Sequence, residues 1–198
     1  MGFRNFTYYR SGVVLAKFRI SGEKVYCVPR DIKTMEFGPE REFSLPMEPF
    51  NAELDRRIAE AAAAVQREAI PDGHEKADDY IAEINGKQLR VERYVQHSGW
   101  YPLDFLVSEG KIVAAIDNER HYIGLLVDGW EAATPQAAME DPLLSKPEYG
   151  MEFIGTEMIP MRDGVRLATD IYLPTQRKAG QKFPTVLIRT CYNKLNTD

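Results

Sequence analysis

Nucleophilic catalysis in this 198-residue chain would depend on its serine, histidine and cysteine residues. Their spacing does not match that of a catalytic triad. A serine nucleophile on a strand-to-helix turn appears as Gly-x-Ser-x-Gly, and the sequence contains no such run. Its serines fall in segments of turn or linker character: Ser11, Ser21, Ser44, Ser98, Ser108 and Ser145. A nucleophile, acid and base therefore cannot be assembled from these residues.

The three histidines lack the spacing of a metal site. His74 lies in an acidic segment, His97 in a turn-like stretch, and His121 beside an arginine. A zinc site needs several such ligands close together, for example a helical pair four residues apart. The neighbouring Asp78 and Asp79 lack the alternating ligands and the glycine of a calcium loop, and no glycine-rich phosphate loop occurs. We expect surface or loop histidines, with no metal and no cofactor.

The most informative stretch runs from residue 158 to residue 194. Asp163 and Gly164 form a turn signal, and alternating apolar residues after them predict a strand that ends at Pro174. A basic loop follows, and residues 183–188 are a continuous apolar run, as expected of a strand buried on both faces. The change from alternating to continuous apolarity favours the start of a new domain over three more strands of one sheet.

At these residues the sequence resembles the serine hydrolases of the cocaine esterase and X-Pro dipeptidyl-peptidase group, the CocE/NonD or peptidase S15 family. The opening pattern of that family is similar to residues 159–168, followed by Asp170, Tyr172 and Pro174. Its third strand is followed by an arginine and a Tyr-x-Lys, which here are Arg189, Tyr192, Asn193 and Lys194. The resemblance covers roughly the last quarter of the chain.

The resemblance implies an α/β-hydrolase fold that acts on a small ester, amide or peptide substrate through an acyl-enzyme. In that family the tyrosine after the third strand donates its hydroxyl to the oxyanion hole, and Tyr192 matches it. Cys191 stands where the family usually has proline. The family's nucleophile, acid and base lie downstream of the matched residues, so the resemblance places none of them in this chain.

Residues 1–131 predict a β-rich module that precedes the hydrolase-like stretch. Residues 6–20 and 25–28 predict a hairpin, and residues 34–45 predict a short strand pair or an extended segment. Asn85 and Gly86 give the strongest hairpin signal, because a two-residue type I′ turn needs positive φ at both positions. That turn pairs residue 84 with 87, 82 with 89 and 80 with 91. Further strands are predicted at residues 100–107, 111–116 and 122–127.

One convincing helix is predicted over residues 51–70. Asn51 is a good N-cap, and Pro71 stops the helix. The apolar stripe has three- and four-residue spacing and comprises Leu54, Ile58, Ala61, Ala62 and Val65. This narrow stripe of small residues favours a helix that covers a sheet over one that binds a partner.

Composition argues against a nucleic-acid-binding, membrane-spanning or secreted protein. The net charge of -5 argues against a nucleic-acid surface, and no run is apolar enough to span a bilayer. The start of the chain lacks the apolar core of a secretory signal. Cys27 and Cys191 lie far apart and fit reduced thiols in a cytoplasmic protein.

The predicted fold is α+β, in two parts. Residues 1–131 form a β-rich antiparallel accessory domain with one main helix, residues 132–150 a linker with one helical turn, and residues 151–198 the first strands of an α/β-hydrolase domain. The first hypothesis is the N-terminal part of a serine hydrolase, inactive by itself. Its partners are the remainder of the hydrolase chain and a second copy of this chain, and the accessory domain serves as a lid, in substrate access or in oligomerisation. The alternative is a non-catalytic binding or assembly module from a truncated gene.

Overall fold

The structure is a computed structural model that describes residues 4–43, 52–97, 102–117 and 123–189. Its contacts divide the chain into two compact units. The first comprises residues 1–30 and 37–146, and the second comprises residues 31–36 and 147–198. The domain boundaries predicted from the sequence stay a prediction.

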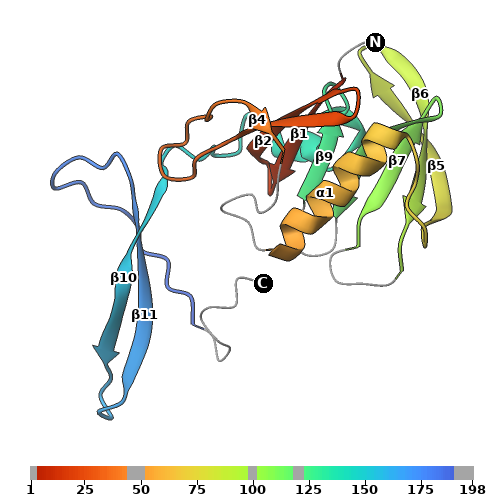
Figure 1. The fold of residues 1–198 in the computed structure, drawn as a ribbon. Helices are drawn as coiled ribbons and strands as arrows, with labels where there is room; N and C mark the ends of the chain where they lie inside the picture. Colours follow the sequence, from red (N-terminus) through yellow and green to blue (C-terminus); the bar gives the residue numbers. More distant parts are fainter. Residues whose placement is uncertain (1–3, 44–51, 98–101, 118–122, 190–198) are drawn as a thin grey trace. The chain divides into compact units, whose positions relative to one another are not determined.

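The first unit is built on a nine-stranded antiparallel sheet, so the predicted β-rich antiparallel character is confirmed (Figure 1). Its order is β4-β3-β2-β1-β9-β8-β7-β6-β5. The strands are β1 (Arg4–Arg10), β2 (Val13–Ser21), β3 (Lys24–Pro29), β4 (Arg41–Glu42), β5 (Glu75–Ile84), β6 (Lys87–Val95), β7 (Asp104–Ser108), β8 (Lys111–Asp117) and β9 (Ile123–Val127). Most neighbours follow one another in the chain, and the pairing of β1 with β9 joins the two ends of the module.

The hairpin at Asn85 and Gly86 forms as predicted. The two residues have φ of 52° and 75°, as a type I′ turn requires. The register pairs Ile84 with Lys87, Ala82 with Leu89 and Tyr80 with Val91, which confirms the prediction. Because side chains alternate across a strand, this register directs Ala82, Ile84 and Val91 to the buried face.

The hairpin predicted around residues 21–24 is confirmed, since β2 pairs with β3 and Ser21 lies opposite Lys24. Its first arm is shorter than residues 6–20, because Ser11 (φ 47°) and Gly12 (φ 81°) form a turn that separates β1 from β2. Where the sequence predicts a strand pair or an extended segment at residues 34–45, the described residues form β4 and a bridge between Phe37 and Arg30. The chain forms a tight loop at residues 31–36 before them.

Helix α1 (Ala52–Arg67) lies across one face of the sheet (Figure 1). The predicted N-cap Asn51 and the side chain of Leu54 lie outside the described residues. The helix ends earlier than predicted, because Glu68 adopts φ of 51° and the Ala69 amide donates to the Ala64 carbonyl at 3.2 Å. This arrangement is a Schellman ending. In the described part of the chain, no helix is both long and apolar enough to cross a membrane.

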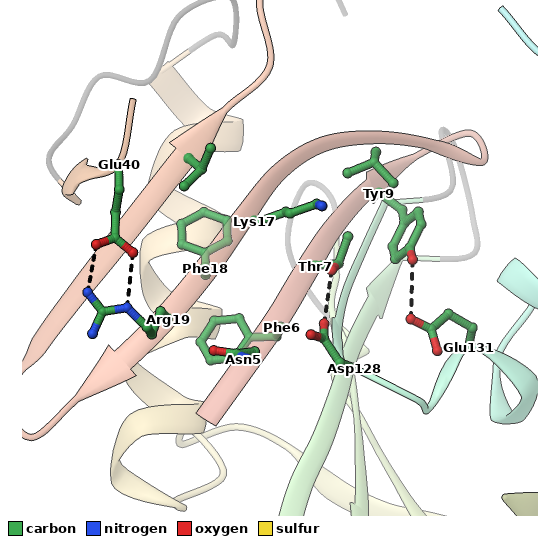
Figure 2. A pocket seen from close by; sticks show the side chains of 12 residues that line it. Asn5, Phe6, Thr7, Tyr9, Lys17, Phe18, Arg19, Glu40, Asp128 and Glu131 are labelled. Carbon is green, nitrogen blue, oxygen red and sulfur yellow. Dashed lines mark hydrogen bonds and ion pairs between the residues drawn. The ribbon is translucent and has the colours of Figure 1, made fainter. Parts of the chain in front are cut away.

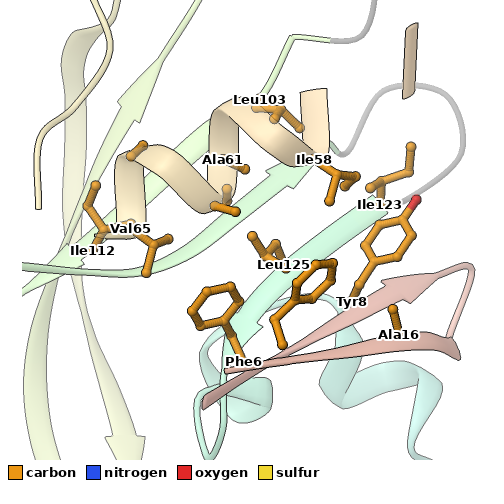
Figure 3. Close-up of a cluster of buried hydrophobic side chains, with 14 of the residues drawn as sticks. Phe6, Tyr8, Ala16, Ile58, Ala61, Val65, Leu103, Ile112, Ile123 and Leu125 are labelled. Atoms are coloured by element: carbon orange, nitrogen blue, oxygen red, sulfur yellow. The ribbon is translucent and has the colours of Figure 1, made fainter. Parts of the chain in front are cut away.

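The main core lies between α1 and the sheet (Figure 3). The predicted stripe is confirmed where it is described, since Ile58, Ala61, Ala62 and Val65 are all buried. They pack with inward-facing strand residues that include Phe6, Tyr8, Phe105, Ile112 and Leu125. Burying a large apolar side chain contributes about 1.5–3 kcal/mol, so this cluster holds helix and sheet together.

A second cluster covers the opposite face of the sheet. It contains Tyr9, Val91, Leu106 and Leu126, with Trp130 packed at its edge. Trp130 precedes the short helix η1 (Glu131–Ala133), and the single helical turn predicted nearby is α2 (Gln136–Met139). Both faces of this sheet therefore carry apolar side chains.

The second unit contains one long hairpin, β10 (Met151–Pro160) with β11 (Arg166–Pro174). The predicted turn at Asp163 and Gly164 is confirmed, with Gly164 at φ of 83°. The predicted third strand is wrong: residues 183–188 form no strand, and Val186, Leu187 and Ile188 are 83%, 70% and 83% exposed. A strand buried on both faces needs neighbouring strands and covering helices; in the described part of this unit β10 and β11 pair only with each other and no helix is present.

Candidate functional site

The predicted catalytic helper Tyr192 lies outside the described residues, as do Cys191 and His121. Arg189, which precedes Cys191 and Tyr192, is exposed. In the motif before it, Asp170 accepts a hydrogen bond from the Thr156 hydroxyl at 2.5 Å, and Tyr172 packs against Phe153 with ring centroids 5.2 Å apart. These motif residues therefore stabilise the β10–β11 hairpin.

The side chains of His74 and Ser108 are hydrogen-bonded to backbone carbonyls. The ring nitrogens of His74 lie 3.0 Å from the Pro71 carbonyl and 2.8 Å from the Leu103 carbonyl. A carbonyl oxygen only accepts, so neither nitrogen is turned toward a hydroxyl whose proton it could take. The Ser108 hydroxyl is buried and donates to the Arg90 carbonyl at 2.8 Å. Neither residue is arranged as part of a nucleophile and base pair.

His97 and Cys27, the other described candidates, are not arranged for catalysis or metal binding either. His97 Nε2 lies 3.2 Å from a carboxylate oxygen of Glu75, and both side chains are strongly exposed. Within the described ranges, no group of three or more His, Cys, Asp or Glu residues could hold a metal ion. Cys27 is a free, buried thiol, and burial raises its pKa to about 11, which keeps it protonated and unreactive near neutral pH.

An open hollow of about 490 Å³ lies on the sheet face that points away from α1 (Figure 2). Phe6 and Phe18 point toward the helix, so the residues alternating with them face the hollow. Its polar lining comes from β1, β2 and the segments after β3 and β9: Asn5, Thr7, Tyr9, Lys17, Arg19, Glu40, Asp128 and Glu131. The alternating polar residues of β1 and β2 are the signal that could have indicated this hollow from the sequence.

Three pairs of polar residues in the hollow bind each other. Thr7 Oγ1 donates to Asp128 at 3.0 Å, and the Tyr9 hydroxyl donates to Glu131 at 3.2 Å (Figure 2). Arg19 makes a bidentate contact with Glu40 at 3.0 and 2.7 Å, which lowers the pKa of that carboxyl. Burial, followed by the nearby Glu131 carboxylate, raises the pKa of Tyr9 well above its ordinary value.

This arrangement offers a polar recess that no serine or cysteine lines. Tyr9 is held in its neutral form, and the arginine is neutralised by a carboxylate. A ligand with a mixed pattern of donors and acceptors could occupy the recess. The two side-chain hydroxyls of the recess, on Thr7 and Tyr9, both donate to carboxylates.

Comparison with known proteins bears on the C-terminal segment alone. No curated protein and no solved structure matches the chain. The model of the family described as X-Pro dipeptidyl-peptidase (S15 family) matches residues 163–198. The match begins at the β10–β11 turn, continues through β11 and includes Tyr192. The resemblance seen in the sequence is thus confirmed for this segment, which is similar to the S15 family of X-Pro dipeptidyl-peptidases.

Proposed function

We propose that this chain is the N-terminal part of a serine hydrolase of the acyl esterase or X-Pro dipeptidyl-peptidase type, located in the cytoplasm. The observation that carries the proposal is the match of residues 163–198 to the S15 family. The nucleophile, acid and base come from residues that follow this sequence. The substrate is a small ester, amide or peptide that forms an acyl-enzyme with that nucleophile.

The exposed surface of the β10–β11 hairpin supports this proposal. Apolar side chains on both of its faces are between 37% and 53% exposed, including Phe153, Ile159, Leu167, Tyr172 and Leu173. A single two-stranded hairpin is only marginally stable in water, and large exposed apolar patches mark interaction sites. The remainder of a hydrolase sheet would cover these faces, and residues 183–188 would then become the buried strand that their composition predicts.

Tyr192 is proposed as an oxyanion-hole donor. A phenol at the end of a central strand can lie within hydrogen-bond distance of the oxyanion that develops in acyl transfer. Residues 1–131 would then form an accessory unit that covers the active site, controls substrate access or mediates oligomerisation.

A second candidate function is a non-catalytic binding module. The hollow of about 490 Å³ favours it, because residues of the first unit alone line that hollow. In this case the first unit would bind a ligand without any contribution from the hydrolase-like segment.

Two proteins test the proposed hydrolase. The 198-residue chain should not hydrolyse an activated ester above background, whereas the chain extended by its downstream residues should, and a fluorophosphonate should block that turnover. In the extended protein Tyr192→Phe should lower kcat by roughly 10²-fold, the typical effect of removing one oxyanion donor. Tyr26→Phe, in the first unit, is the matched control and should leave kcat unchanged. Turnover by the 198-residue chain itself, with a fluorophosphonate adduct on one of its own serines, would refute the proposal.

A further inference from the structure

Three successive carbonyls of the loop at residues 31–36 bind the base of the β10–β11 hairpin. The Ile32 carbonyl accepts from the Met151 amide at 2.9 Å. The Lys33 carbonyl accepts from the Thr175 hydroxyl at 2.5 Å, and the Thr34 carbonyl accepts from Gln176 Nε2 at 2.9 Å. Met151 begins β10, and Thr175 and Gln176 directly follow β11. The loop therefore binds both strands of the hairpin at its open base, the start of β10 and the end of β11.

The loop is organised by its own hydrogen bonds. Asp31 Oδ1 accepts the amides of Thr34 and Lys33 at 3.1 and 2.6 Å, and these bonds lower the pKa of the Asp31 carboxyl. The Met35 amide donates to the Asp31 carbonyl at 2.8 Å, and the Asp31 amide donates to the Glu36 carbonyl at 2.9 Å. A loop already fixed in this way loses little conformational entropy when it binds the hairpin.

Gly150 allows the loop and the hairpin to approach closely. A Cβ atom at this position would lie 1.8 Å from the Lys33 carbonyl oxygen and 2.6 Å from Thr175 Oγ1. Gly150 does not have a positive φ, so the requirement for glycine comes from space and not from backbone conformation. The Gly150 carbonyl also accepts a hydrogen bond from the Thr175 amide at 2.9 Å; Gly150 directly precedes β10, and Thr175 directly follows β11.

We infer that residues 31–36 are an intrachain clamp for the hydrolase-like hairpin. The contact between Thr175 and Lys33 spans 142 residues of sequence, and the clamp lies between β3 and β4 in the chain. The N-terminal half of the chain therefore supplies part of the second compact unit. If the proposed hydrolase function is correct, this gives the N-terminal half a positioning role: it holds the first hairpin of the catalytic domain.

Amide hydrogen exchange of the 198-residue chain tests the clamp. In Gly150→Ala the added methyl must displace the Lys33 carbonyl, so the amides of Met151 and Thr175 should exchange at least roughly tenfold faster. Gly38→Ala is the matched control. Gly38 also lacks a positive φ, and its Cβ would meet the Pro29 carbonyl oxygen at an ordinary 3.6 Å. Amides of β8, in the first unit, should exchange at the same rate in both variants.

A second pair of variants removes one hydrogen bond without adding volume. Thr175→Val deletes the donor to Lys33 and should also speed exchange at Met151 and Thr175. Thr169→Val is its control, because among the described residues the Thr169 hydroxyl bonds only to the nearby Leu167 carbonyl, at 3.3 Å. Exchange in Gly150→Ala and Thr175→Val within twofold of their controls would overturn the clamp, and so would an equal acceleration in β8. Hydrolase activity is not measured, so these outcomes are independent of the proposed function.

Discussion

At the scale of single residues, the Tyr9 hydroxyl is the most informative group in the first unit. It is nearly buried and donates to Glu131 at 3.2 Å, which joins β1 to the segment after β9. Tyr9→Phe leaves a charged acceptor without this donor. We expect the free energy of unfolding to fall by about 1 kcal/mol at pH 7, measured by urea denaturation. Tyr26→Phe, on the same face of the sheet, should change it by less than half as much.

The raised pKa of Tyr9 predicts that the stability of the fold depends on pH in the alkaline range. Burial and Glu131 raise the pKa of Tyr9 in the folded state above its ordinary value of 10.0. A group whose folded pKa is raised contributes its full stability below the unfolded pKa and loses it as pH rises further. The native protein should therefore lose more stability than Tyr9→Phe between pH 9 and 11, values that bracket the ordinary tyrosine pKa of about 10. Parallel curves for the two proteins would contradict this assignment.

Cys27 should be inert toward thiol reagents. With its pKa raised to about 11 by burial, the thiolate fraction at pH 8 is roughly a hundredfold below that of a thiol at its ordinary pKa. In a Cys191→Ser background only Cys27 remains, because the chain has two cysteines. Its alkylation by iodoacetamide should be at least roughly a hundredfold slower in the native protein than in urea. Equal rates in the two states would show that Cys27 is accessible.

At the scale of elements, α1 depends on small residues where it meets the sheet. Ala61 is fully buried in the main core, whereas Ala63 lies on the more exposed side of the same helix. Ala61→Leu adds volume to a close-packed interior and should cost about 1–3 kcal/mol. Ala63→Leu changes the same residue type with little added crowding and should cost under about 0.5 kcal/mol. Thermal unfolding compares the two variants, and similar melting temperatures would contradict the packing described for α1.

Elements such as the Asn85–Gly86 hairpin and helix α1 could be predicted because their sequence signals lie within a few residues of one another. The Asn85 and Gly86 turn and the α1 stripe each depend on residues a few positions apart, and both are confirmed where they are described. The sequence places Ser11 in a turn-like segment but does not divide residues 6–20 there, because serine rarely adopts positive φ and Gly12 alone is a weak turn signal. The pairing of β1 with β9 could not be predicted, since it brings together segments more than a hundred residues apart whose alternation fits several partners.

The error at residues 183–188 has a different cause. Their continuous apolarity predicts a buried strand, but apolar composition specifies only that a segment requires burial and does not supply the surface that buries it. Leu187 is 70% exposed here. The same limit applies to the clamp at residues 31–36, because backbone carbonyls bind the hairpin and their direction leaves no mark in the side-chain pattern.

At the scale of the whole molecule, the exposed apolar residues of the second unit should make the chain bind hydrophobic dyes and associate with itself. Replacing Val186, Leu187 and Ile188 by serine should reduce dye fluorescence and self-association in analytical ultracentrifugation. The free energy of unfolding should change by less than about 0.5 kcal/mol, because these side chains are already exposed. A large loss of stability would show that they are buried.

The candidate site was predictable from the sequence only as a family resemblance. The S15 match confirms the resemblance for residues 163–198, while the role of Tyr192 stays a prediction. The hollow beside Tyr9 was not predicted, because its lining comes from strands β1 and β2 and from segments near residues 40 and 130 that only the folded sheet brings together.

The coding sequence beyond codon 198 tests the central claim most directly. We predict that the reading frame of Tyr192 continues into a Gly-x-Ser-x-Gly segment and a later histidine. The serine of that segment should then be the residue labelled by a fluorophosphonate in the complete protein. A stop codon directly after Asp198 would contradict the hydrolase proposal and leave the binding module as the function of this chain.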